Sequence, residues 1–206
     1  QNAGMRTVQV IGVPEGIAPQ DADAVVVALK SRTAAPAEAV AHAAAALAWL
    51  RKHGAEQILF KYCSTFDSTD SGNIGPVADA LLEAMGEPFT VACPAFPTNR
   101  RTVYLGHLFV GEQLLSESPM KDHPLTPMRD ANLVRVLGRQ TKRKVGLVPL
   151  PVVREGPGAL RDAFARLKDS GCAYAIVDAV ADEDLLSLGV ACREMPLLTG
   201  GSGLAM

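Results

Sequence analysis

Several features of other protein classes are missing from this 206-residue chain. It contains no apolar run of the length that crosses a bilayer, so we expect no membrane contact. Its formal net charge of −2 offers no general attraction for nucleic acid. The most plausible partner is therefore a small molecule, and the oligomeric state stays open, a homo-oligomer included.

Cysteine motifs are missing as well. The four cysteines are far apart and form no CxxC pair, and no histidine pair has metal-ligand spacing. Reduced, mostly buried thiols are typical of a cytoplasmic protein, so we predict a cytoplasmic location and no metal site in this chain.

Glycine fingerprints for nucleotides and the serine elbow of hydrolases are also absent. The sequence has neither GxGxxG nor GxxxxGK[ST], and no GxSxG. An NAD-dependent oxidoreductase is therefore disfavoured, because no glycine fingerprint follows the first apolar strand.

Apolar runs that alternate with helix-period stretches fill the chain. This alternation predicts an α/β fold, a mostly parallel open sheet with helices on both faces. The predicted strands are Thr7–Val13, Ala24–Leu29, Gln57–Tyr62, Phe89–Cys93, Val145–Leu150, Ala173–Asp178 and Leu197–Thr199. The predicted helices are Pro36–His53, Pro76–Met85, Asp130–Arg139, Ala159–Ser170 and Asp182–Leu188. A β-hairpin near residues 102–115 is expected at the sheet edge.

The two ends of the chain are abrupt. The chain starts at Gln1, close to a strand, and stops at Met206, where a helix is expected to begin. We therefore expect residues 1–206 to be one truncated domain of a longer protein.

Polar clusters follow several predicted strands. Lys61 ends an apolar run and leads into a loop of hydroxyls and carboxylates; Arg32 follows the second strand, and a Gly-Gly-Ser-Gly run follows the last. Carboxyl ends of parallel strands share one edge of a sheet, where ligands bind. We predict a site for a small hydroxylated anion, formed by Arg32, Lys61, Ser64, Thr65, Asp67, Asn73, Gly200, Gly201 and Ser202.

Each of these residues also has an ordinary structural explanation. Hydroxyl, Asp and Asn side chains often cap turns, and Lys61 or Arg32 at an edge can simply reach solvent. The glycine run suits an anion only if a helix N-terminus follows it.

Longer motifs resemble a known family, the four-carbon acid sugar kinases, and within it the 3-oxo-tetronate kinase branch. They are Lys61–Ser68, Gly72–Val77, Cys93–Pro97, Arg101–Val110, His123–Met128 and Thr199–Gly203. Many relatives acting on threonate or erythronate carry aspartate at the position of Cys63 and an arginine near Asp67.

The resemblance implies the N-terminal substrate-binding domain of an ATP-dependent kinase that phosphorylates the terminal hydroxyl of a four-carbon acid sugar. It implies ATP and Mg²⁺ as cofactors of the full-length parent, bound outside this fragment. The family's first strand, with its Asp-Asp-Phe-Thr-Gly motif, and its nucleotide-binding domain are missing. We therefore expect no catalytic residue here and binding without turnover. The alternative is a non-catalytic sugar-acid-binding module.

Overall fold

The computed structural model describes residues 4–16 and 21–206. At its centre lies a five-stranded parallel sheet with the strand order β3-β10-β4-β9-β8. The strands are β3 (Ile58–Lys61), β4 (Thr90–Cys93), β8 (Lys144–Val148), β9 (Cys172–Val177) and β10 (Leu197–Gly200). Every residue of β4 and β9 is buried, which explains why these strands read as continuous apolar runs.

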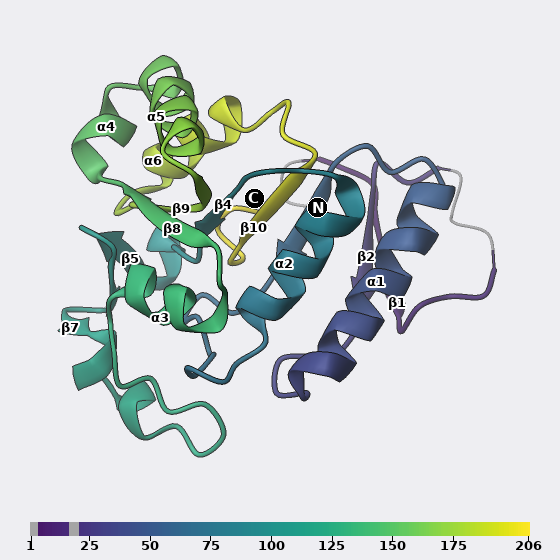
Figure 1. Ribbon diagram of the computed structural model, residues 1–206, viewed down its shortest axis with the longest axis horizontal. Helices are drawn as coiled ribbons and strands as arrows, with labels where there is room; N and C mark the ends of the chain where they lie inside the picture. The colour runs from purple at the N-terminus through teal and green to yellow at the C-terminus, as the bar shows by residue number, and fades with distance from the viewer. Residues whose placement is uncertain (1–3, 17–20) are drawn as a thin grey trace.

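Two groups of helices flank this sheet, which confirms the predicted α/β class. Figure 1 shows α1 (Pro36–Lys52) and α2 (Ile74–Met85) side by side, with α3 (Leu133–Gln140) next to α2. The second group contains α4 (Leu150–Arg154), α5 (Pro157–Asp169) and α6 (Asp182–Ala191). Of the helices described, none is both long enough and apolar enough to span a membrane.

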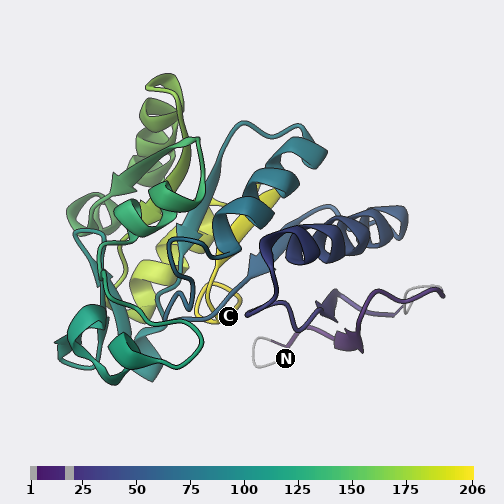
Figure 2. The same cartoon turned by 60° about the horizontal axis from the view of Figure 1, so that its bottom comes forward.

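The first two strands form a sheet of their own. β1 (Thr7–Ile11) pairs in parallel with β2 (Ala24–Ala28), and Figure 2 shows this purple pair below α1. The predicted strands therefore exist, but within the described residues they do not pair with the central sheet. Alternating hydrophobicity identifies a strand without identifying its neighbour, which is why the sequence did not predict this separation.

The predicted hairpin is part of a three-stranded antiparallel sheet, the inserted sheet. It contains β5 (Arg101–Tyr104), β6 (His107–Val110) and β7 (Gln113–Leu114). Three short 3₁₀ helices flank it, η1 (Pro97–Asn99), η2 (Leu115–Glu117) and η3 (Pro119–Asp122). The inserted sheet joins the central sheet beyond the carboxyl end of β9, through paired backbone hydrogen bonds between Val103 and Ala179 of 2.8 and 3.0 Å.

Asp178 holds this junction together. Its buried carboxylate accepts hydrogen bonds from the backbone N–H groups of Leu105 (2.7 Å), Gly106 (2.9 Å) and Leu150 (3.0 Å). Burial raises the pKa of this carboxyl, and the three N–H donors oppose that effect. Asp178, the last residue of the predicted sixth strand, thus links the inserted sheet, α4 and β9.

Among the element boundaries that differ from the sequence prediction, two have a clear physical reason. The strand predicted to reach Leu150 ends at Val148, and α4 follows it, because Pro149 separates the two segments in an extended conformation. The helix predicted from Asp130 begins at Leu133, because the side chain of Asn132 caps it by accepting a hydrogen bond from the N–H of Arg135 (3.0 Å).

Candidate functional site

The loop from Cys63 to Asn73, which we call the signature loop, follows β3 and is held in one conformation. Phe66 is fully buried at a positive φ of 61°, a region that side chains of this size avoid. Its ring packs edge-on against Tyr62, with centroids 5.3 Å apart. Strain of this kind, of order 1–3 kcal/mol, persists where the surroundings impose it, and such positions cluster at functional sites.

Asp67 brings two of the predicted residues to one point. Its carboxylate is 5% exposed and accepts hydrogen bonds from the hydroxyl of Thr65 (2.5 Å) and from Nη1 of Arg32 (3.3 Å). The Arg32 side chain is mostly exposed. Its charge is thus already partly balanced by the protein, so Arg32 offers less attraction to a ligand carboxylate than the sequence suggested.

Asn73 fastens the signature loop to the loop after β2. Its side-chain amide donates to the backbone carbonyls of Ser31 (2.8 Å) and Ala34 (3.0 Å). The loops after β2 and β3 therefore meet, as the sequence predicted for strand ends at one edge. Both N–H groups of Asn73 are used in this tie, which leaves its Oδ1 for any ligand hydroxyl.

Lys61 lies at the exposed end of β3, in register with Gly200 of β10. Gly200 and Gly201 are glycines because the backbone after β4 passes very close to them. A Cβ atom would lie 2.7 Å from the Cys93 carbonyl oxygen at Gly200, and 2.4 Å from the Pro94 carbonyl oxygen at Gly201. This close approach accounts for the glycine run without a bound anion.

Residues 202–205, where a helix was expected to begin, form turns, with the N–H groups of Ala205 and Met206 bonded to the carbonyls of Ser202 and Gly203 (3.3 Å each). The helix N-terminus of the predicted cradle stays a prediction. Ser64 and Ser202 are half-buried, and their hydroxyls make no hydrogen bond within the part of the chain that the structure describes. The structure thus joins Arg32, Thr65, Asp67 and Asn73, and separately sets Lys61 beside Gly200; ligand contacts at these residues remain a prediction.

A cavity of about 720 Å³ lies on the other side of the signature loop, between this loop, α3 and the inserted sheet. We call it the arginine cavity. Its lining residues are Ser68, Thr69, Asp70, Ser71, His107, Leu114, Ser116, Pro127, Met128, Arg129, Asp130, Ala131, Arg135, Val136 and Arg139.

Ion pairs organise the wall that α3 contributes. Asp130 binds Arg135 through two hydrogen bonds of 2.7 and 3.0 Å, and Arg139 lies 3.3 Å from the same carboxylate and 3.2 Å from that of Asp70. The hydrogen bond from Arg135 holds the pKa of the Asp130 carboxyl below its usual value, so this group is ionised at neutral pH.

The sequence prediction did not include these arginines. Arg135 and Arg139 are four residues apart on a short amphipathic helix, a pattern that usually marks a solvent-exposed face. The available signal was the concentration of arginine at positions 129, 135 and 139 directly after the His123–Met128 motif.

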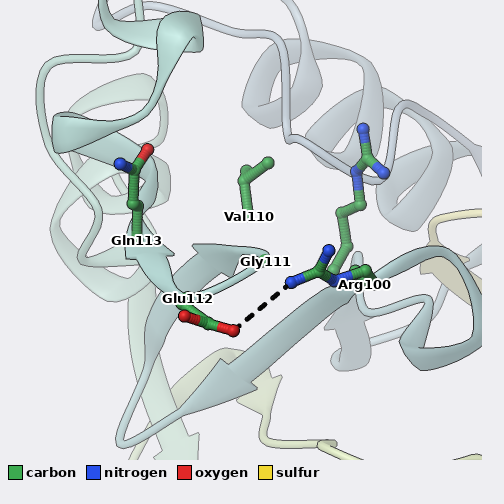
Figure 3. Close-up of a pocket in the computed structure, with 6 residues that line it drawn as sticks. Arg100, Val110, Gly111, Glu112 and Gln113 are labelled. Atoms are coloured by element: carbon green, nitrogen blue, oxygen red, sulfur yellow. Dashed lines mark ion pairs between the residues drawn. The ribbon is translucent and has the colours of Figure 1, made fainter.

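A second, shallower cavity of about 430 Å³ lies on the inserted sheet. Figure 3 shows Arg100 and Glu112 facing each other across it, with a nitrogen–oxygen distance of 3.6 Å. Both side chains are largely exposed, so this pair contributes little binding energy. Among the described residues, no group of three or more His, Cys, Asp or Glu side chains is arranged to hold a metal ion.

Comparison with known proteins identifies the family. Residues 1–206 match the family described as sugar-binding N-terminal domain. The chain belongs to this family. A relative from Pseudomonas fluorescens, named 3-oxo-tetronate kinase, is 63% identical over 205 residues, which are 98% of this chain and 48% of that protein. The chain thus spans about half the length of the curated relatives it matches.

Solved structures of similar proteins support the fold. A Haemophilus influenzae protein is 51% identical, with a TM-score of 0.96, over 98% of this chain and 49% of the other. A Bordetella bronchiseptica protein, crystallised with bound citrate as a domain-swapped dimer, is 28% identical, with a TM-score of 0.80, over 98% and 49%.

Proposed function

We propose that this chain is the acid-sugar-binding domain of a longer ATP-dependent kinase that phosphorylates the terminal hydroxyl of 3-oxo-tetronate. The observation that carries the proposal is the family match over the whole chain, together with relatives named 3-oxo-tetronate kinase at 50–63% identity. The signature loop supports it, because a fixed loop rich in hydroxyl groups suits a polyhydroxylated ligand. Citrate in the Bordetella bronchiseptica protein is also a hydroxylated acid.

The residues that the structure describes do not fit a nucleotide or Mg²⁺ site. The chain has no Gly-rich phosphate loop with a lysine, and the described residues contain no group of carboxylates that could hold a metal. We propose that the remainder of the parent protein binds ATP and Mg²⁺. An Asp-Asp strand preceding Gln1 would then supply the base, as the family resemblance implies.

In this proposal the domain binds the acid sugar and orients it. Holding the acid sugar so that its terminal hydroxyl faces the transferred phosphoryl group replaces an encounter in solution with a prearranged one.

Four free cysteines support a cytoplasmic location. The domain-swapped dimer of the Bordetella bronchiseptica protein supports a homo-oligomeric parent.

A coupled ADP-release assay tests the function. The full-length parent should phosphorylate 3-oxo-tetronate, whereas the 206-residue chain should bind four-carbon acids without turnover. Turnover by the chain alone would contradict the proposal that the rest of the parent protein binds ATP and Mg²⁺. A parent that binds the acid but never releases ADP would support the non-catalytic module.

Lys61→Ala tests the binding residues predicted from sequence. Lys61 is exposed, so its removal should leave the fold intact and weaken acid-sugar affinity of the parent by about tenfold, through the loss of one charged contact. The readout is the apparent KM for the acid, with circular dichroism as the folding control. An unchanged KM removes Lys61 from the site.

A further inference from the structure

The arginine cavity has an excess of positive charge. Three arginines line it, Arg129, Arg135 and Arg139, together with the acidic residues Asp70 and Asp130. Both carboxylates are already paired, and within residues 4–16 and 21–206 Arg129 has no ion-pair partner. Arg129 is exposed to solvent, and arginine is the side chain best suited to bind a carboxylate with two parallel hydrogen bonds.

His107 is held at the cavity wall through both of its ring nitrogens. Its Nδ1 lies 2.9 Å from the Leu105 carbonyl oxygen, and its Nε2 lies 3.4 Å from the side-chain nitrogen of Asn132. The carbonyl oxygen can only accept a hydrogen bond, so Nδ1 is the donor in the contact with Leu105.

Hydroxyl groups in the cavity lining are available to a ligand. Ser71 and Ser116 lie on opposite segments of the wall, the signature loop and η2. In the described part of the chain, neither hydroxyl makes a hydrogen bond. Each serine hydroxyl can both donate and accept, which matches the hydroxyl groups of a sugar acid.

The walls are held in position before any ligand arrives. Gln140, at the end of α3, donates to Ser68 Oγ (2.9 Å) and the Thr69 carbonyl (2.7 Å), and accepts from the Gly75 N–H (2.9 Å). The opposite wall is fastened by the backbone bond from Leu133 to Gly106 (2.8 Å). A site whose groups are already ordered loses less entropy on binding.

We propose that the arginine cavity is a carboxylate-binding site for a small hydroxylated acid, with Arg129 as its principal anion contact. The site is additional to the residues predicted from sequence, because the signature loop separates the two. The proposal rests on the proposed function only for the expected size of the acid, four carbons; the charge and the hydroxyl groups are properties of the cavity itself.

Titration of the ¹⁵N-labelled chain with L-threonate locates the site directly. We expect saturable shifts of the backbone N–H signals of Ser71, Arg129 and Ala131. Arg129→Gln should weaken this binding by about tenfold or more, and Arg129→Lys by less, because lysine keeps the charge without the bidentate geometry. The matched control is Arg161→Gln, an exposed arginine of α5 outside the cavity lining, which should bind like the unchanged chain.

Three results would overturn the proposal: shifts confined to Lys61–Thr65 and Gly200–Ser202, equal affinity of Arg129→Gln and the unchanged chain, or tighter binding of inorganic phosphate than of L-threonate. Absence of any shift would overturn it too. None of these results bears on the ADP-release assay of the parent, so failure of the cavity and failure of the kinase assignment are distinguishable.

Discussion

The two sides of the signature loop use charge differently. On the side that faces the loop after β2, Arg32 is bound to a buried carboxylate of the protein, Asp67. On the side that faces α3, two arginines share Asp130, and Arg129 lacks a carboxylate partner in the described residues. A cationic side chain near a strand end therefore attracts a ligand anion strongly only if no carboxylate of the protein already pairs with it.

The largest expected effect comes from forcing apart α3 and the start of α2, which directly follows the signature loop, at Gly75. A Cβ atom there would lie 2.6 Å from Gln140 Cβ and 2.8 Å from the Gln140 carbonyl oxygen. Gly75→Ala should therefore lower the free energy of unfolding by about 3 kcal/mol, measured by urea denaturation. Gly189→Ala is the matched control: a Cβ there meets open space within α6, so this change should stabilise by about 0.5–1 kcal/mol. Equal effects of the two changes would show that the start of α2 is not packed against the end of α3.

The next largest expected effect is a difference in stability loss between substitutions of Asp67 and Asp70, the two aspartates of the signature loop. Asp67→Asn weakens hydrogen bonds to a buried carboxylate and should cost about 2 kcal/mol of unfolding free energy. Asp70→Asn removes an exposed ion pair with Arg139 and should cost less than about 0.5 kcal/mol. Similar losses in urea denaturation would contradict the distinction between the two sides.

The smallest effect concerns the pH dependence of Asp130. Its folded-state pKa lies below the ordinary value of 3.8, so its ion pairs stabilise the fold above that pH and are lost as the pH falls through the folded pKa. The stability difference between the unchanged chain and Asp130→Asn should be under about 1 kcal/mol at pH 6, and should narrow as pH falls below 4. Urea midpoints of both proteins, measured at several pH values, check this. If the stability difference does not narrow below pH 4, the ion pairs of Asp130 are not its source.

Much of the fold was predictable because the buried strands and amphipathic helices have clear patterns. The strands β4 and β9 are buried throughout, and α2 is capped at its C-terminus by Gly86, whose φ of 69° suits glycine. Strand pairing was harder to predict: the β1–β2 pair matches the pattern of central strands but stands apart from them.

The candidate site was only partly predictable. The sequence placed Thr65, Asp67 and Asn73 in one loop, and the structure confirms their common location. It gave no means to see that Asp67 neutralises Arg32, because the two residues are 35 positions apart. Nor did it show that the glycines after β10 serve a close backbone approach, since the neighbouring segment belongs to β4.

Asp178 also determines how the inserted sheet can move. One side chain ties the turn between β5 and β6 to the start of α4 and to the end of β9. Because the turn between β5 and β6 is tethered in this way, we expect entry to the arginine cavity to depend on side-chain rotation at its rim rather than on movement of the inserted sheet. Solute exchange there should consequently be fast, on the nanosecond scale of exposed rotamers rather than the slower scale of a moving flap.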